Sequence, residues 1–355
     1  MKSVFLIKTP LQLLNAVEAK YAFGLNSQDC VLIIMGDRKS QPQALNLVGS
    51  MEEWGEVLVL SDISLFFNGG DKVSVYDFIW KMKIFSKSFF NVRRLNRISR
   101  YLGKVEYIFI GYARYVYMTH FMNMTPHEAI YLLDDGNATL QLAKERKEGC
   151  RAVVVKGGLR KLKYIIKKYV QGVKCNDAEK LGFFTIYEIE TSESDHVVVN
   201  KYEHIRSELN KVDQSNGVYF LGSPLCETGL IETGEYIRCL QRVKEYYNDS
   251  EMIYVSHRRE NPENLDRIKN KLDIEIVEFN YPIEYQLASV GPKPKVLASF
   301  ISSALDSCRV IFEEKLDIVS FKLDYQSSPV KDKIADIYES YESKTSKHFH
   351  VRSDY

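Results

Sequence analysis

Short apolar runs alternate along this chain with longer segments of helical periodicity. In the first half each run is rich in Val, Ile, Leu or Phe and ends in polar or glycine residues; these runs cover residues 3–10, 30–37, 55–62, 105–112 and 128–136. Between the first two runs, "LQLLNAVEAKYAF" places apolar residues at helical spacing. Strand, helix and strand in this order predict an open, mostly parallel sheet with helices on both faces.

The same pattern starts again in the second half, after a polar and charged segment at 200–217. The later runs and helix cover residues 217–225, 232–248, 251–260, 273–280 and 294–307. A chain of 355 residues also exceeds the size at which single hydrophobic cores stop growing. The sequence therefore predicts an α/β protein of two Rossmann-like domains facing a cleft. We expect them at residues 1–205 and 215–340, followed by a polar tail at 341–355.

Composition excludes several classes of protein. A hydrophobic content of 45% and a charged content of 27% are typical of soluble globular proteins. A net charge of +1 argues against a dedicated nucleic-acid binder, which carries a basic excess. The six cysteines are scattered without a CxxC pair, a spacing that fits neither a zinc site nor a disulfide framework. Free thiols in a reducing compartment are the expected reading.

The N-terminal segment is apolar but does not read as a targeting signal. Lys8 and Pro10 interrupt the apolar run, and no small-residue cleavage site follows. No stretch approaches the ~20 apolar residues that a membrane span needs. We therefore expect a cytoplasmic protein.

Two basic stretches stand out against the near-neutral average. Residues 151–174 hold eight Lys or Arg and no acid, with apolar residues at helical spacing, and residues 80–104 are basic with interleaved aromatics. A basic amphipathic helix suits an anionic membrane surface or an acidic polymer. For either stretch alone, a solvated basic face over a core-packed apolar face is the ordinary alternative. Together they favour a peripheral contact at the cytoplasmic face of the inner membrane, or an anionic acceptor.

An acidic pair follows the last apolar run of the first half. Asp134 and Asp135 come directly after "YLL", and Gly136 follows them. Adjacent carboxylates repel each other, so such a pair needs a partner or a use. Ligands of open parallel sheets bind beyond the carboxyl ends of the strands, where this pair is expected to lie. A catalytic site and a plain polar turn are both consistent with the pair alone.

Four short features of the second half lie at comparable strand ends. They are "LGSPL", "YVSHRRE", "NYPIEYQL" and "FISSALDS", with the candidate residues Gly222, Ser223, Ser256, His257, Arg258, Glu284, Ser302 and Ser303. The serine pair stands at a strand-to-helix junction, where hydroxyls and backbone N–H groups form an anion site. The "LGSPL" turn is expected to line the cleft. Taken singly, each feature is explained as well by a turn, a helix cap or a surface histidine.

Together these features resemble the motifs of the bacterial sialyltransferases of the two-domain glycosyltransferase B (GT-B) type, in the related families 52, 80 and 38. The opening "IKTPLQLLNAVEA" is similar to the N-terminal strand, turn and helix of the family 52 lipooligosaccharide sialyltransferases. The resemblance spans Ile7 to about Leu305. The matching motifs, in order, are Asp134-Asp135-Gly136, His257-Arg258, Pro282-Ile283-Glu284 and Ser302-Ser303.

One motif departs from the family pattern. Arg258 stands where those families usually have a proline that shapes the loop of the histidine. Arg259 and Glu260 still match the "HPRE" form of the motif found in some members. The resemblance therefore keeps His257 as a site residue and leaves the shape of its loop open.

The resemblance implies transfer of sialic acid from CMP-sialic acid to a sugar hydroxyl, with inversion at the anomeric carbon. The expected acceptor is a galactoside of a cell-surface glycan such as lipooligosaccharide or capsule. Asp135 would take the proton of the attacking hydroxyl. Asp134 would raise the proton affinity of the pair, which titrates jointly, and Gly136 would let the backbone approach the substrate.

The second-half residues would bind the donor. His257 and the hydroxyls of Ser302 and Ser303, with their helix N-terminus, would stabilise the charge of the departing phosphate. Glu284 would accept hydrogen bonds from the ribose or cytosine. The tertiary anomeric carbon of the donor supports an oxocarbenium-like transition state, so we expect no metal requirement.

Three alternatives share this pattern. A transferase for another CMP-activated keto-sugar, such as pseudaminic acid, legionaminic acid or Kdo, would use the same phosphate and cytidine contacts. A nucleotide-sugar epimerase of the same fold would bind a uridine nucleotide and need no base on an acceptor side. A non-catalytic nucleotide-sugar-binding protein could keep the fold, but the intact Asp135 and His257 argue against it.

Overall fold

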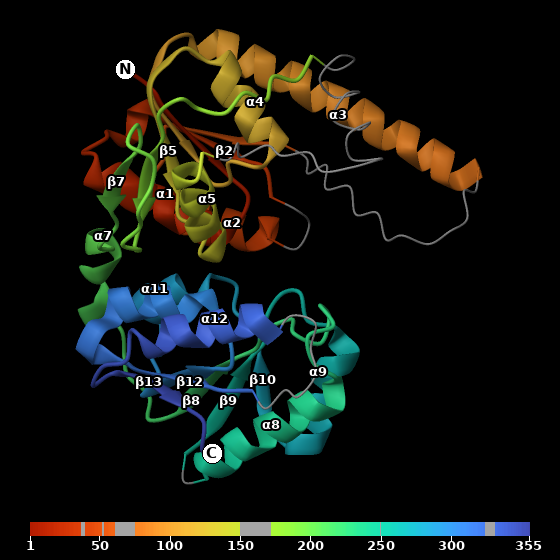
Figure 1. Ribbon diagram of the computed structural model, residues 1–355, viewed down its shortest axis with the longest axis vertical. Helices are drawn as coiled ribbons and strands as arrows, with labels where there is room; N and C mark the ends of the chain where they lie inside the picture. The colour runs from red at the N-terminus through yellow and green to blue at the C-terminus, as the bar shows by residue number, and fades with distance from the viewer. Residues whose placement is uncertain (37–39, 52, 61–74, 150–171, 249, 324–330) are drawn as a thin grey trace. The chain divides into compact units, whose positions relative to one another are not determined.

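The chain folds into two compact units. The computed structural model describes residues 1–36, 40–51, 53–60, 75–149, 172–248, 250–323 and 331–355. Unit 1 spans Met1–Asn200 and unit 2 spans Lys201–Tyr355. Each unit is built around one parallel sheet flanked by helices (Figure 1).

Unit 1 contains a seven-stranded sheet in the order β3-β2-β1-β4-β5-β6-β7, with every pair parallel. The strand order reverses between β1 and β4, and ligands of such sheets bind beyond the carboxyl ends at a reversal of this kind. The strands are β1 (Ser3–Ile7), β2 (Cys30–Ile34), β3 (Glu56–Val59), β4 (Val105–Ile110), β5 (His127–Leu133), β6 (Gly182–Thr185) and β7 (His196–Val199). The helices are α1 (Pro10–Ala22), α2 (Gln41–Ser50), α3 (Val75–Leu102), α4 (Val116–Met124) and α5 (Asn137–Lys147).

The central strands of unit 1 are mostly apolar because both faces of the sheet are covered. All five residues of β1 and of β2 are buried. Phe5 of β1 stacks on Phe109 of β4 with ring centroids 4.4 Å apart. Thr9 caps α1, accepting a hydrogen bond from the backbone N–H of Gln12 at 3.2 Å, and Pro10 occupies the first helical turn.

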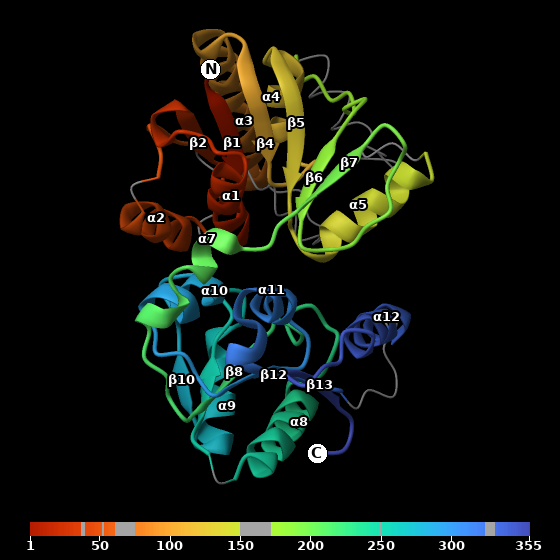
Figure 2. The same cartoon turned by 90° about the vertical axis from the view of Figure 1, so that its left-hand side faces the viewer.

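Unit 2 contains a six-stranded parallel sheet in the order β10-β9-β8-β11-β12-β13 (Figure 2). Its strand order reverses between β8 and β11. The strands are β8 (Val218–Leu221), β9 (Met252–Val255), β10 (Glu275–Val277), β11 (Val296–Ser299), β12 (Asp317–Phe321) and β13 (Phe349–Arg352). The helices are α7 (Glu203–Arg206), α8 (Thr233–Tyr246), α9 (Pro262–Leu272), α10 (Ile283–Tyr285), α11 (Ser303–Phe312) and α12 (Lys331–Glu342).

The prediction of two Rossmann-like α/β units is confirmed. The prediction of a polar tail at 341–355 is wrong. Residues 349–352 form β13, which pairs in parallel with β12. Phe349 is fully buried and His350 lies beside Val319. A strand of four residues among polar neighbours carries too little apolar content to be recognised by periodicity, which explains the error.

The two basic stretches have different outcomes. The stretch at 151–174 lies almost entirely outside the described residues. The stretch at 80–104 belongs mainly to α3, which buries Val92 and Leu95 and exposes Arg93, Arg94 and Arg97. From residue 89 on, the helix thus packs on the core and carries a basic outer face, and its contact with a membrane stays a prediction.

A buried histidine ties α4 to two neighbouring segments of unit 1. His120 is fully buried, its Nε2 lies 2.9 Å from the side-chain oxygen of Asn96, and its Nδ1 accepts the backbone N–H of Lys174 at 3.0 Å. Burial, with a smaller effect of the Lys174 charge, lowers the pKa of His120 from 6.5 to about 4. The neutral ring of His120 is therefore a structural part of unit 1.

Acid is expected to destabilise unit 1 through His120. Below pH 6.5 the unfolded chain binds a proton at this ring that the folded chain refuses until about pH 4, so the unfolding free energy falls through this window. Urea unfolding at several pH values measures the effect in the wild type and in His120→Gln. The wild type should lose more stability than the variant as the pH falls, and equal losses would exclude His120 as the cause.

Within the part of the chain that the structure describes, no helix is both long and apolar enough to cross a bilayer. The five described cysteines are free thiols, three of them buried. The cytoplasmic location stays a prediction.

Candidate functional site

The acidic pair lies at the carboxyl end of β5, as predicted. Leu133 ends the strand, and Asp134 follows it with a side chain that is 3% exposed. The carbonyl oxygen of Asp134 accepts a hydrogen bond from the side-chain amide of Asn15 on α1 at 2.9 Å. Asn200 in turn donates to the amide oxygen of Asn15 at 3.1 Å. The turn is therefore fixed to the helix that follows β1.

The Asp134 carboxylate faces the protein interior. One oxygen accepts the backbone N–H of Gly136 at 2.9 Å, and the other accepts the hydroxyl of Thr185 at 2.9 Å and the N–H of Ile186 at 3.3 Å. Burial raises the pKa of Asp134, while these hydrogen bonds oppose the rise. Asp134 joins the ends of β5 and β6 and shapes the turn, so the geometry makes it a positioning residue.

Asp135 is the half-buried member of the pair. Its backbone N–H donates to the hydroxyl of Thr139 at 2.8 Å, and its carboxylate precedes the N-terminus of α5, where the helix dipole favours negative charge. A small pocket beside it is lined by residues 111–114 of the loop after β4. The structure thus places Asp135 where two neighbouring strands end.

Gly136 adopts a backbone conformation that side chains oppose. Its φ is +64° and its ψ is −131°, at the residue just before α5. A glycine adopts this left-handed φ without steric cost, whereas a Cβ would strain the turn. The glycine is therefore needed for the chain to reverse from β5 into α5 and carry Asp135 at the bend.

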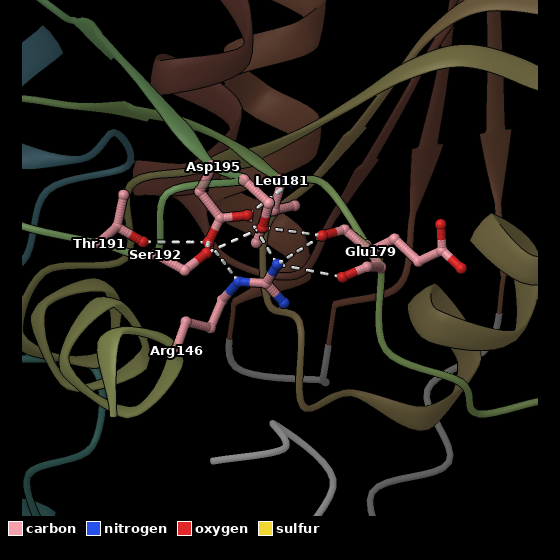
Figure 3. Close-up of polar contacts among 8 residues, drawn as sticks. Arg146, Glu179, Leu181, Thr191, Ser192 and Asp195 are labelled. Atoms are coloured by element: carbon pink, nitrogen blue, oxygen red, sulfur yellow. Dashed lines mark hydrogen bonds and ion pairs between the residues drawn. The ribbon is translucent and has the colours of Figure 1, made fainter. Parts of the chain in front are cut away.

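The far end of α5 is held by a buried ion pair that the sequence analysis missed (Figure 3). Arg146 donates from Nε and Nη2 to the two carboxylate oxygens of Asp195, at 2.6 and 2.7 Å. Asp195 also accepts the hydroxyl of Ser192 at 2.8 Å and the N–H of Leu181 at 2.9 Å. Burial opposes ionisation, but the hydrogen bonds of Arg146, Ser192 and Leu181 outweigh it and lower the pKa of Asp195.

A larger surface groove of about 720 Å³ lies at the amino end of β5, away from Asp135. His127, Glu128, Asp177 and Lys180 line it. Lys104 and Glu128 pair across part of it at 3.2 Å. Charges of both signs give the groove no preference for an anionic or a cationic ligand, so we assign none.

In unit 2 the candidate residues other than Glu284 follow the carboxyl ends of β8, β9 and β11, which are neighbours in the sheet, and Glu284 lies in α10 after β10. His257 comes two residues after β9 and is half-buried. Its Nδ1 accepts the backbone N–H of Arg259 at 3.1 Å. When neutral, the ring therefore carries its proton on Nε2, which makes that atom a hydrogen-bond donor.

The loop that carries His257 is hydrogen-bonded to Glu260, which was predicted only as part of a motif. Glu260 is 7% exposed, and one of its oxygens accepts the backbone N–H of His257 at 2.6 Å. Burial raises its pKa to about 7, although hydrogen bonds from Tyr254 and from the His257 backbone oppose the rise. A Cβ on Gly222 would lie within 3 Å of the Glu260 carboxylate and the Tyr254 ring, so a larger residue there would have to displace these side chains.

The serine pair begins α11, as predicted. Ser302 caps the helix, its hydroxyl accepting the N–H of Ala304 at 3.3 Å, and Ser303 is exposed. The hydroxyl of Tyr341 on α12 donates to the carbonyl of Ser302 at 2.8 Å and accepts its N–H at 3.2 Å. The Ser223 hydroxyl donates to the carbonyl of Ile301. The turn after β8 and the start of α11 are thereby joined.

Three further predicted residues have structural partners. Ser256 bonds the carbonyl of Val277 through its N–H at 2.9 Å and its hydroxyl at 3.2 Å. Glu284 is 3% exposed and accepts a hydrogen bond from the hydroxyl of Ser307 at 2.6 Å. Burial raises the pKa of Glu284, while that hydrogen bond and the charge of Arg258 oppose the rise. Arg258 is half-buried. Direct contacts of these residues with a donor stay predictions.

Two Rossmann-like units of parallel sheet, each with polar loops at the carboxyl ends of its strands, define the GT-B class of glycosyltransferases and related enzymes. A family model described as alpha-2,8-polysialyltransferase (POLYST) matches residues 3–315. The chain belongs to that family, and is thereby a glycosyltransferase. The finer placement beside families 52, 80 and 38 stays a prediction.

Comparison with solved structures gives distant matches. A UDP-N-acetylglucosamine 2-epimerase of Listeria monocytogenes is 10% identical, with 90% of this chain and 78% of that chain covered and a TM-score of 0.48. Anabaena HepE in complex with UDP-glucose is 10% identical over 97% and 90% of the chains, with a TM-score of 0.43. MurG of Acinetobacter baumannii is 10% identical over 98% and 88%, with a TM-score of 0.38. No curated protein sequence matches the chain.

Proposed function

We propose that this chain transfers sialic acid from CMP-sialic acid to a sugar hydroxyl of a cell-surface glycan, with inversion at the anomeric carbon. The observation that carries the proposal is the family match over residues 3–315, which includes every candidate residue of both units. Asp135, His257 and Ser302 all stand at strand ends, where ligands of such sheets bind.

On the acceptor side, Asp135 acts as the general base. The acceptor oxygen forms a bond to the anomeric carbon of the donor as its proton passes to the Asp135 carboxylate. The bond from that carbon to the CMP phosphate oxygen breaks, and its electron pair leaves with CMP. Asp134 and Gly136 hold the turn that presents the base.

On the donor side, the loops of unit 2 bind CMP and stabilise the departing phosphate. His257 donates from Nε2, and the Ser303 hydroxyl and the N-terminal N–H groups of α11 add further donors. Preorganised donors of this kind stabilise the charge that develops on the phosphate oxygens. The residues supply the stabilisation themselves, so we propose that the reaction needs no metal ion.

The acceptor has two candidates. The family description names an α-2,8 linkage between sialic acids, which favours a glycan that already ends in sialic acid. The motif resemblance instead implies a galactoside. Both acceptors carry a hydroxyl that a carboxylate base can activate, so the choice is left to experiment.

Release of CMP from a panel of CMP-activated sugars tests the proposal. CMP-sialic acid, CMP-Kdo and the CMP derivatives of pseudaminic and legionaminic acid are each incubated with lactose, with an α-2,8-linked sialic acid oligomer and without acceptor. We expect acceptor-dependent release from CMP-sialic acid, unchanged by EDTA. Turnover of another CMP-sugar alone would move the donor assignment, and release of CMP from none of the four would overturn the proposal.

A further inference from the structure

Behind the donor loops of unit 2 lies a buried carboxyl group that the proposed chemistry does not use. Glu260 is 7% exposed and stands three residues after His257. A carboxylate removed from water is costly unless hydrogen bonds satisfy it. Its two oxygens are satisfied, one by the N–H of His257 and the other by the hydroxyl of Tyr254, both at 2.6 Å.

The hydrogen bonds continue from Glu260 through two buried tyrosines. The Tyr254 hydroxyl, fully buried in β9, lies 2.9 Å from the hydroxyl of Tyr236 on α8, which is 1% exposed. Since Tyr254 gives its only proton to Glu260, Tyr236 must donate to Tyr254. The turn after β8 packs against this series, because a Cβ on Gly222 would lie within 3 Å of the Glu260 carboxylate and the Tyr254 hydroxyl.

This series joins the loops that follow β8 and β9. The backbone N–H of His257 and the hydroxyls of Tyr254 and Tyr236 donate toward the Glu260 carboxylate, and the Gly222 backbone of the turn after β8 lies against it. The hydroxyl of Ser223 extends the connection to Ile301, one residue before the cap of α11. All three loops expected to hold the donor phosphate are therefore linked by buried contacts and hydrogen bonds, and hydrogen bonds arranged in series strengthen one another.

We propose that Glu260, Tyr254 and Tyr236 are positioning residues that hold the donor-binding loops of unit 2 in the geometry needed to bind CMP. The proposal rests on the proposed function of those loops. Removing one hydroxyl breaks the series and leaves a buried group without its partner, so the loops relax. The loss should appear in donor binding, and the acceptor side should be unaffected.

The test measures CMP affinity by isothermal titration calorimetry. The variants are Tyr254→Phe, Tyr236→Phe and the double variant. Tyr338→Phe is the matched control, because Tyr338 is 4% exposed in the same unit and its hydroxyl bonds the backbone of Phe321 and Leu323 at the end of β12. Urea unfolding of each variant confirms that the fold is retained.

Each single variant should bind CMP about 10-fold more weakly than the wild type. The double variant should match the single variants, since either change already breaks the series, and Tyr338→Phe should stay within about twofold of wild type. In transfer assays the KM for the CMP-sugar should rise while the KM for the acceptor stays constant.

Three outcomes would overturn this inference, and they distinguish its failure from that of the function it rests on. If the wild type binds CMP and the Tyr254 and Tyr236 variants bind as tightly as Tyr338→Phe, the positioning role is wrong and the proposed function stands. If the two single losses multiply in the double variant, the residues do not act in series. If the wild type does not bind CMP, the proposed donor site is wrong, and the inference that rests on it is wrong as well.

Discussion

Replacing Asp135 with alanine should lower the turnover number of sialyl transfer about 10²- to 10⁴-fold and leave CMP affinity unchanged. The alanine removes the only carboxylate of the acidic pair that reaches the pocket beside α5, because Asp134 is turned inward. The acceptor hydroxyl then attacks without a base. Initial rates with CMP-sialic acid, and CMP titration of the same preparation, measure the two quantities.

Two variants control for indirect effects on α5. Asp135→Asn keeps the size of the side chain and removes its basicity, so it should lose as much turnover as the alanine. Glu148→Ala removes an exposed carboxylate just past the other end of α5 and should keep wild-type turnover. Full turnover by Asp135→Asn would show that Asp135 is not the base.

Replacing Arg146 with alanine should lower the unfolding free energy of unit 1 by about 3–5 kcal/mol, the usual loss when one partner of a buried ion pair is removed. The variant leaves Asp195 buried without its cation (Figure 3). In the wild type the side chain of Arg146 is 11% exposed and that of Asp195 is 0% exposed. Both tryptophans, Trp54 and Trp80, are in unit 1, so their fluorescence during urea unfolding reports on this unit.

The control for Arg146 is the next residue of the chain. Lys147 pairs with Glu190, but both side chains are largely exposed, and such surface pairs contribute about 0–1 kcal/mol. Lys147→Ala should therefore unfold close to the wild-type urea concentration. An Arg146→Ala variant as stable as Lys147→Ala would mean that the ion pair does not hold α5 in place.

The strands that line each candidate site were predictable because they are continuous apolar runs. The segments around β1, β4 and β5, for example, are buried on both faces and read as strands without further information. Four strands escaped prediction, the interior strands β6 and β12 and the edge strands β7 and β13, since runs of four or five residues carry almost no periodic signal.

The site was predictable in its positions and less so in its roles. Asp134 and Asp135 look equivalent in sequence, and only the fold shows that one turns inward to Thr185 while the other stays at the surface. Glu260 carried a weak local signal, its spacing from His257. Tyr236 carried none, because its contact with Tyr254 joins a helix to a strand 18 residues away.

The mass of an acceptor oligosaccharide, measured before and after incubation with CMP-sialic acid, tests the central claim most directly. With the wild-type protein, an acceptor that ends in sialic acid or galactose should gain one or more whole sialyl residues as CMP is released in equal amount. The Asp135→Ala protein should bind CMP and leave the acceptor unchanged. An acceptor that gains no mass, from a wild-type protein that binds CMP, would contradict the assignment as a sialyltransferase.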